Sequence, residues 1–270
     1  MIKSAITSRR WVALPVAAAL LLTGCGSFLG TSGEDYVSDE AAASGGSSTT
    51  LPVTTSPPLP PAPTPPAPTA GQPALAAVSP ASLASPQALE QRLADLRFDV
   101  TPDGVMDDNT RQALIAFQKL SGLPRTGKSD PAVVDALASA TLPSPLKPDG
   151  GPTRVEIDLG RQVLFLYLNG TLHKVLPISS GTGKRYCDEG KCGIATTPKG
   201  TFRIERRING WRKSDLGRLY NPLYFTGGIA IHGFPSVPPT PASHGCVRIP
   251  MGSADAFPKL VTDGTPVFVI

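Results

Sequence analysis

Charge of one sign and long apolar runs are both scarce in this sequence of 270 residues. Lys and Arg outnumber Asp and Glu by only 25 to 21, which gives a net charge of +4. No dense run of Lys or Arg follows the first ten residues, so a nucleic-acid partner has no support. The apolar stretch at residues 11–22 is too short to span a bilayer comfortably, which disfavours a retained transmembrane anchor.

The N-terminus has the pattern of a secretory signal. Lys3, Arg9 and Arg10 precede the apolar stretch, and small residues stand directly before Cys25. This ending resembles a bacterial lipobox, in which the cysteine is lipidated and becomes the mature N-terminus. We therefore expect residues 1–25 to be a lipoprotein signal peptide, and a lipid on Cys25 to tether the chain to the plasma membrane or another envelope membrane. An ordinary secretory signal with a coincidental cysteine is the alternative.

The composition changes twice before the last domain. Residues 26–85 are rich in Pro, Ser, Thr and Ala and cannot bury enough apolar surface to fold, so they are predicted to be a disordered linker. Residues 86–141 carry apolar side chains at helical spacing, interrupted by turn and capping signals that indicate three helices. A second, shorter linker is expected at residues 142–152.

The helical segment resembles the small three-helix peptidoglycan-binding domain that is often fused to cell-wall enzymes. A generic helical spacer is the alternative, and most of the apolar residues are expected to be core. The residues that carry the resemblance are Leu93, Phe98, Asp103-Gly104-Val105, Thr110, Ala113, Phe117-Gln118, Gly122-Leu123 and Thr126-Gly127.

Residues 153–270 change to a period of two with many β-branched side chains. Short alternating runs follow one another, and Asn169-Gly170 between two of them is a strong hairpin signal. A helix is indicated only at residues 254–260. The segment is therefore predicted to be a mainly-β domain with a core of its own.

The chemistry-bearing residues of this domain gather near its end. Cys246 lies within Ser243-His244-Gly245-Cys246-Val247-Arg248, and His232 lies shortly upstream. A thiol becomes a strong nucleophile when a nearby base removes its proton. A buried cysteine with two packing histidines is the alternative. A zinc site built from these residues with Cys187 and Cys192 matches no standard ligand spacing.

Five ordered blocks make the domain similar to the L,D-transpeptidase catalytic domain of the YkuD type over its whole length. We therefore expect a multidomain chain, in which a mainly-β YkuD-type β-sandwich follows a small all-α domain. The spacer between His232 and Ser243 is short for the family, and Arg248 stands where one branch has Asn. The blocks are Gly181-Thr182-Gly183-Lys184, Thr197-Pro198-Lys199-Gly200, Tyr220-Asn221-Pro222-Leu223-Tyr224-Phe225, Ile231-His232-Gly233 and Ser243 to Arg248.

The resemblance implies a role for each matching residue. Cys246 would be the nucleophile, His232 the general base, and the Gly233 carbonyl would orient the imidazole. Backbone N–H groups of the catalytic loop would bind the oxyanion, those of His244, Gly245 and Cys246. Four residues would contact the substrate: Tyr224 and Tyr220 in the donor groove, with Ser243 and Arg248. A structural salt bridge or turn hydrogen bond is the alternative for Arg248.

The resemblance further implies a two-step acyl transfer without metal or organic cofactor. A cysteine thioester would form on one peptidoglycan stem peptide, and the amine of another stem would resolve it into a 3→3 cross-link. Water as acceptor would make an L,D-carboxypeptidase, and a protein amine would make a protein-anchoring enzyme. A non-catalytic wall-binding lipoprotein is the remaining alternative. Carbapenem-type β-lactams are expected to acylate the same cysteine.

Two cysteines are left without a role by these assignments. Cys187 and Cys192 lie in a polar stretch with glycines, which we expect to be a loop. In an oxidising compartment they are candidates for a local disulfide near the donor groove. Two unpaired thiols are the alternative.

Overall fold

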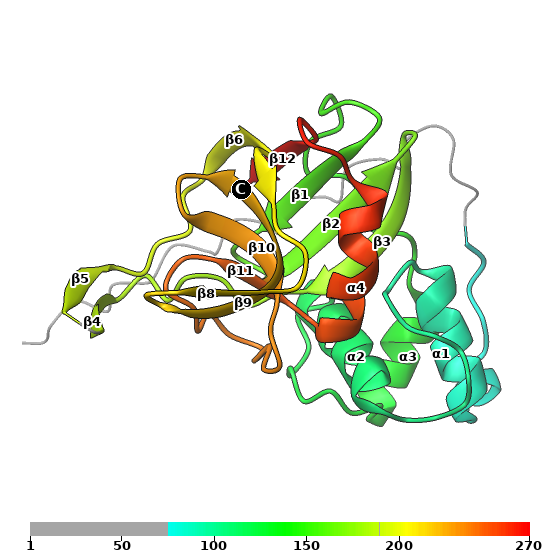
Figure 1. The fold of residues 1–270 in the computed structure, drawn as a ribbon. Helices are drawn as coiled ribbons and strands as arrows, with labels where there is room; N and C mark the ends of the chain where they lie inside the picture. Colours follow the sequence, from blue (N-terminus) through cyan, green and yellow to red (C-terminus); the bar gives the residue numbers. More distant parts are fainter. Residues whose placement is uncertain (1–74, 189) are drawn as a thin grey trace, which may run out of the picture. The chain divides into compact units, whose positions relative to one another are not determined.

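A computed structural model describes residues 75–188 and 190–270 of the chain (Figure 1). Cys25, the signal segment and most of the first linker lie outside the described residues. No helix in the described part is long and apolar enough to cross a bilayer.

Three short helices make up the N-terminal part of the described chain: α1 (Pro86–Asp95), α2 (Asp108–Leu120) and α3 (Pro131–Ser139). Each begins where the sequence supplies a start signal. The hydroxyl of Ser85 accepts a hydrogen bond from the Ala88 N–H at 3.2 Å, and the Asp107 carboxylate accepts one from the Thr110 N–H at 2.9 Å. The sequence prediction of a three-helix segment is confirmed here.

The predicted linkers are more ordered than expected. Residues Pro80–Leu83 form a 3₁₀ helix, and the Leu83 side chain is buried among the helices, so a disordered linker up to residue 85 is wrong for this part. Residues 142–152 contain no regular element, yet Leu142 and Leu146 pack against the helical core. In both linkers, apolar side chains pack against the helical core and so order the chain around them.

The first sheet has the strand order β3-β2-β1-β12-β6. Its strands β2 (Val163–Leu168) and β3 (Thr171–Pro177) are joined by the hairpin that Asn169-Gly170 predicts. Asn169 and Gly170 both have positive φ, at 51° and 81°, as a type I′ turn requires. The remaining strands are β1 (Arg154–Asp158), β12 (Pro266–Val269) and β6 (Gly200–Arg203).

The second sheet carries the sequence blocks of the motif. Its order is β11-β10-β9-β7, and β8 pairs with β9 at the edge. Helix α4 (Met251–Leu260) packs beside β9 and β10. The strands are β7 (Arg206–Arg207), β8 (Trp211–Ser214), β9 (Gly217–Thr226), β10 (Ile229–Gly233) and β11 (Val247–Ile249).

One prediction of a loop was wrong. The stretch around Cys187 and Cys192 forms a β-hairpin, β4 (Arg185–Asp188) and β5 (Lys191–Ile194), which protrudes from the two sheets (Figure 1). The two cysteines face each other in register and are joined by a disulfide. Because the strands are polar and short, their sequence shows none of the apolar alternation by which strands are recognised.

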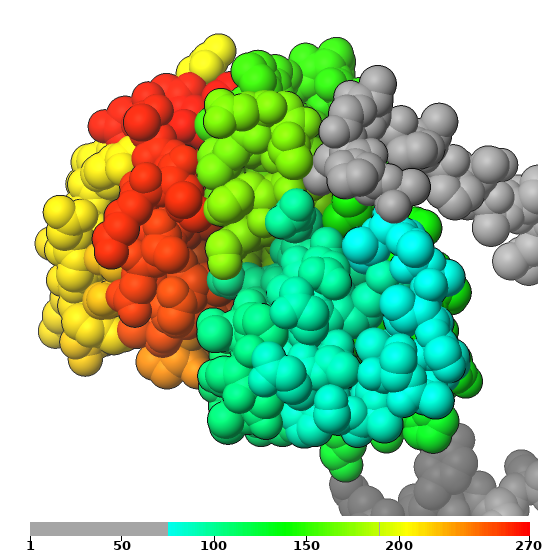
Figure 2. All heavy atoms as spheres, turned by 90° about the vertical axis from the view of Figure 1, so that its right-hand side faces the viewer, coloured from blue at the N-terminus to red at the C-terminus, as the bar shows by residue number. Residues whose placement is uncertain are grey.

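Two large apolar clusters organise the described chain. One fills the space between the sheets, and includes Ile157, Phe225, Val247 and Val267. The other joins the helices to strands β2 and β3, because Phe165 and Val175 pack with Phe98 and Phe117. Figure 2 shows the blue-green atoms of the helical segment against the yellow-green atoms of β3. The helical segment therefore shares a core with the β domain.

Candidate active site

The register of the second sheet places the cysteine and a histidine on one face. Strands β10 and β11 run parallel, with Ile231 opposite Val247 and His232 opposite Arg248. Side chains alternate between faces along a strand, so Ile231 and Val247 point into the core. His232, Arg248 and Cys246, which immediately precedes β11, lie on the opposite face, where a pocket opens.

The His232 imidazole is held by its neighbour. Its Nδ1 lies 2.9 Å from the Gly233 carbonyl oxygen, which can only accept. The proton is therefore on Nδ1, and Nε2 is the free acceptor. Burial lowers the pKa of His232 to about 4; the hydrogen bond to the carbonyl acts in the opposite direction, and Arg248 lowers it further. At neutral pH the ring is uncharged and can take up a proton.

Cys246 is the free thiol among the described cysteines. Its Sγ lies 3.7 Å from the Gly228 carbonyl oxygen. Burial raises the pKa of the thiol, while the Ala230 N–H and the Arg248 guanidinium favour the thiolate. The resting pair is thus a neutral thiol and a neutral imidazole, so the thiolate forms when the proton moves to a base.

Other motif blocks brace the loop that holds Cys246. The Thr197 hydroxyl donates to the Gly245 carbonyl at 2.6 Å and accepts from the Gly181 N–H at 3.0 Å. Gly245 has φ of +146°, and a Cβ there would lie 2.9 Å from the Thr196 carbonyl oxygen. Only glycine fits this position without strain. Two blocks that are distant in sequence therefore fix the backbone at the thiol.

Two predicted site residues serve this loop. The Ser243 hydroxyl accepts from the Gly245 N–H at 3.0 Å and donates to the Cys246 carbonyl at 2.5 Å. Ser243 borders the pocket, and its hydroxyl also supports the loop through these two bonds; its contact with substrate stays a prediction. The first of these bonds occupies the Gly245 N–H, which removes it from the oxyanion-binding groups expected from the sequence.

The two tyrosines differ in their positions. Tyr224 lies opposite Ala230 on β9 and lines the pocket, packed with Leu219 under the thiol. The Tyr220 hydroxyl donates to the Asp255 carboxylate of α4 at 2.6 Å, and its ring contacts Trp211. Tyr220 is therefore not among the pocket residues, and its prediction as part of the donor groove is wrong.

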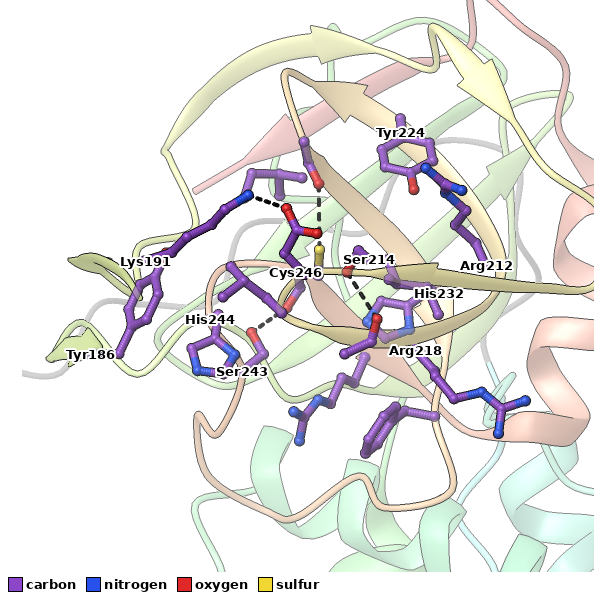
Figure 3. Close-up of a pocket in the computed structure, with 18 of the residues that line it drawn as sticks. Tyr186, Lys191, Arg212, Ser214, Arg218, Tyr224, His232, Ser243, His244 and Cys246 are labelled. Carbon is purple, nitrogen blue, oxygen red and sulfur yellow. Dashed lines mark hydrogen bonds and ion pairs between the residues drawn. The ribbon is translucent and has the colours of Figure 1, made fainter. Parts of the chain in front are cut away.

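The pocket around Cys246 has a volume of about 520 Å³. Figure 3 shows Cys246 between two groups of side chains, with Tyr186 and Lys191 on one side and Arg212 and Arg218 on the other. The first group comes from the β4–β5 hairpin and the second from β8 and β9. The thiol is thus open to a ligand that runs between two hairpins.

The β4–β5 hairpin is attached to both sides of the pocket. Its Asp188 carboxylate lies 2.6 Å from His244 Nε2, and the Tyr186 ring contacts the His244 ring edge-on at 4.6 Å. Its Lys191 forms an ion pair with Asp215 at the tip of the β8–β9 hairpin. No role for Asp188 or Tyr186 was predicted from the sequence. Both residues flank Cys187 in the sequence, and this position next to a disulfide cysteine was the available signal for them.

The described residues contain no group of three or more His, Cys, Asp or Glu side chains that could hold a metal ion. Cys187 and Cys192 are bonded to each other, so they are not free ligands for the alternative zinc site. The third histidine, His173, is exposed on β3.

Comparison with known proteins gives two family matches. Residues 152–269 match the L,D-transpeptidase catalytic domain, and residues 83–137 match a peptidoglycan-binding domain. A search of curated proteins gave no match. The match to the helical segment supports the sequence resemblance over the alternative of a generic spacer.

Solved structures that are similar to this chain include two L,D-transpeptidases. The crystal structure of the L,D-transpeptidase from Xylanimonas cellulosilytica is 36% identical, with a TM-score of 0.64, and the match covers 78% of this chain and 100% of that one. An L,D-transpeptidase from Stackebrandtia nassauensis is 22% identical, with a TM-score of 0.42, over 68% of this chain and 89% of that one. The chain carries the motif blocks around Cys246, and a structure that is 36% identical matches it over 78% of its length. The chain therefore belongs to the L,D-transpeptidase family.

Proposed function

We propose that this protein forms 3→3 cross-links between peptidoglycan stem peptides through a thioester on Cys246. The observation that carries the proposal is the free thiol in a pocket, on the same sheet face as a neutral His232 whose Nδ1 is fixed by a carbonyl. That arrangement provides a nucleophile and a proton acceptor without further groups. Family membership supplies the reaction class.

In the first step, the Cys246 sulfur attacks the carbonyl carbon of the third residue of a tetrapeptide stem, a diamino acid. The thiol proton passes to Nε2 of His232 as the C–S bond forms. The backbone N–H groups of His244 and Cys246 stabilise the oxyanion. The C–N bond to the terminal D-alanine then breaks, and His232 returns the proton to the leaving amine. The thioester stays on the enzyme.

In the second step, the side-chain amine of a neighbouring stem attacks the thioester carbonyl. His232 accepts a proton from the attacking amine, the C–S bond breaks, and the proton returns to the Cys246 sulfur. The product is an amide between the third residues of two stems. Water in place of the amine gives the carboxypeptidase product, and a protein amine gives an anchored protein.

The test uses purified protein without the signal segment and Cys25, incubated with a defined tetrapeptide. Intact-mass spectrometry should show a tripeptide acyl adduct and release of D-alanine, and an added diamino-acid amine should convert the adduct into cross-linked dimer. Cys246→Ala should retain the fold by circular dichroism and lose both products. Only hydrolysed tripeptide in the presence of amine would identify a carboxypeptidase. Turnover by Cys246→Ala would reject the nucleophile, and sacculus binding without any turnover would identify a wall-binding protein.

We also propose that the enzyme works outside the cytoplasm, held at the membrane by lipid on Cys25 and at the wall by its helical segment. The lipobox-like ending at Leu22 to Cys25 and the peptidoglycan-binding family match support this. Metabolic labelling with a fatty acid analogue should mark the full-length chain. Cys25→Ala should lose the label and leave the membrane fraction. Labelling of that variant would contradict the lipid site.

A further inference from the structure

Cationic side chains around the Cys246 pocket outnumber the carboxylates that line it. Five basic side chains border it, against one carboxylate, Asp215, which pairs with Lys191. The other four form no ion pair or side-chain hydrogen bond within the described chain: Arg206, Arg212, Arg218 and Arg248. Asp215 also interacts electrostatically with Arg212, without forming an ion pair with it. Each guanidinium carries five N–H donors in a planar fork, so the pocket holds many unused donors.

Arg248 is the most informative of the four. It is half-buried on the same sheet face as His232 and interacts electrostatically with Cys246. A cation removed from water without a counter-ion is costly, and such groups are kept where a ligand supplies the charge. The thiol is neutral at rest, so Cys246 does not supply that charge before reaction.

Aromatic rings hold three of the guanidinium groups. The Arg248 group lies 4.2 Å from the centre of the Phe234 ring, Arg206 4.0 Å from Tyr224, and Arg218 4.4 Å from Trp211. Stacking fixes the plane of a guanidinium and leaves its edge N–H groups free. These arginines are therefore oriented before a ligand arrives.

The sheet register places one arginine in line with the thiol. Arg206 on β7 lies opposite Tyr224 on β9, and Tyr224 lies opposite Ala230 on β10. Ala230 is the residue whose N–H faces the Cys246 sulfur. Arg212 lies opposite Leu219, which packs with Tyr224 beneath the pocket. Positive groups thus continue from the thiol across the sheet.

We propose that these arginines select stem peptides whose carboxyl groups are free over stems in which the same groups are amidated. A planar fork of N–H donors matches a carboxylate in two parallel hydrogen bonds, whereas an amide offers one oxygen and no charge. Arg248 binds the carboxylate nearest the attacked carbonyl, and Arg206 and Arg212 bind one farther along the stem. The inference rests on the proposed function, since it concerns the donor in the first step.

The experiment compares two tetrapeptide donors that differ only in amidation of their side carboxyl groups. Acylation of Cys246 is followed by mass spectrometry and kcat/KM by D-alanine release. We expect the free-carboxylate donor to be preferred about tenfold or more, the size of effect typical of a charge-assisted hydrogen bond. Arg212→Gln and Arg206→Gln should each remove most of this preference by slowing only the free-carboxylate donor. Arg212→Lys, which keeps the charge and loses the fork, should recover part of it.

The matched control is Arg203→Gln. Arg203 lies on β6, outside the pocket, and donates to the Gly264 carbonyl at 2.8 Å. Arg203→Gln should leave the preference for the free-carboxylate donor unchanged. Equal kcat/KM for the two donors, or equal losses for both in the arginine variants, would overturn the selection while leaving the transpeptidase proposal in place. Failure of both donors to acylate Cys246 would reject the proposed function, and the selection with it.

Discussion

Buried cations of the helical segment contrast with the cations at the catalytic pocket. Lys119 of α2 is buried, and its Nζ donates to the carbonyls of Gln162 and Ile178 at 3.0 and 2.8 Å. Arg92 of α1 is buried too, and it donates to four backbone carbonyls. None of the four pocket arginines has such a partner in the described chain. Satisfied donors hold the fold together, and unsatisfied ones in a pocket indicate where a ligand binds.

In both regions, burial shifts the pKa of an ionisable group. Burial lowers the pKa of both Lys119 and His232, to about 7 and about 4. At the domain contact the lysine sits among fixed acceptors. In the pocket the histidine keeps an open Nε2, so loss of its charge leaves a lone pair for chemistry. The contrast between groups hydrogen-bonded within the chain and groups left open to a ligand can be tested by substitution.

The largest effect should come from covalent blocking of the thiol. We predict that carbapenem-type β-lactams acylate Cys246, because the strained lactam carbonyl presents the same electrophile as the donor amide. Ring opening keeps the amine tethered, so the thioester persists. Intact mass should show one drug adduct on the wild type and none on Cys246→Ala. An adduct that survives this substitution would mean that another nucleophile reacts.

Substitution of the base should have the next largest effect. His232→Ala should lower kcat/KM by roughly 10²–10⁴, the usual cost of a lost general base. His244→Ala should cost less, since its proposed role uses only its backbone N–H. Steady-state kinetics on the two variants checks the ranking. A greater loss of kcat/KM in His244→Ala than in His232→Ala would mean that His232 is not the general base.

The pH dependence of stability should distinguish Lys119 from an ordinary surface lysine. Its pKa is about 7 in the folded protein, against 10.5 for an ordinary lysine, so the unfolded chain binds more protons between these values. Stability therefore rises as pH increases from about 7 towards 10.5 and loses this contribution as pH falls back to 7. The effect should amount to a few kcal/mol, because one pKa unit corresponds to about 1.4 kcal/mol.

Urea unfolding at pH 7, 8.5 and 10 measures this effect. Lys119→Met should be less dependent on pH than the wild type over that range, since the titrating amine is gone. Its overall stability also changes, because the two carbonyls lose a donor. The difference in pH slope isolates the titration, and identical slopes for the two proteins would show that Lys119 keeps its charge when buried.

The sequence predicted the elements whose causes are local. Asn169-Gly170 located a hairpin, apolar periodicity located the helices, and the motif blocks identified the family. It missed what depends on distant contacts. The two hydrogen bonds of the Ser243 hydroxyl within the catalytic loop were not predicted. Tyr220 was placed in the groove, but its hydroxyl turns towards α4. Asp188 could not be linked to His244 before the hairpin fold was known.

The smallest effect should come from opening the β4–β5 disulfide. Purified protein without Cys25 should contain one free thiol, that of Cys246, and three would reject the bond. Because the bond closes a short loop, its loss in a Cys187→Ser, Cys192→Ser variant should cost less than the ~3 kcal/mol estimated for a fifteen-residue loop.

The same hairpin carries Asp188, which contacts His244 beside the thiol. We therefore expect the double serine variant and Asp188→Asn to lower kcat to a similar, modest extent while unfolding in urea changes little for Asp188→Asn. Lys128→Gln, a surface change outside the hairpin and the pocket, is the control. If kcat falls only in the variant that is destabilised, the hairpin has a structural role alone. A loss without destabilisation would show that it positions the catalytic loop.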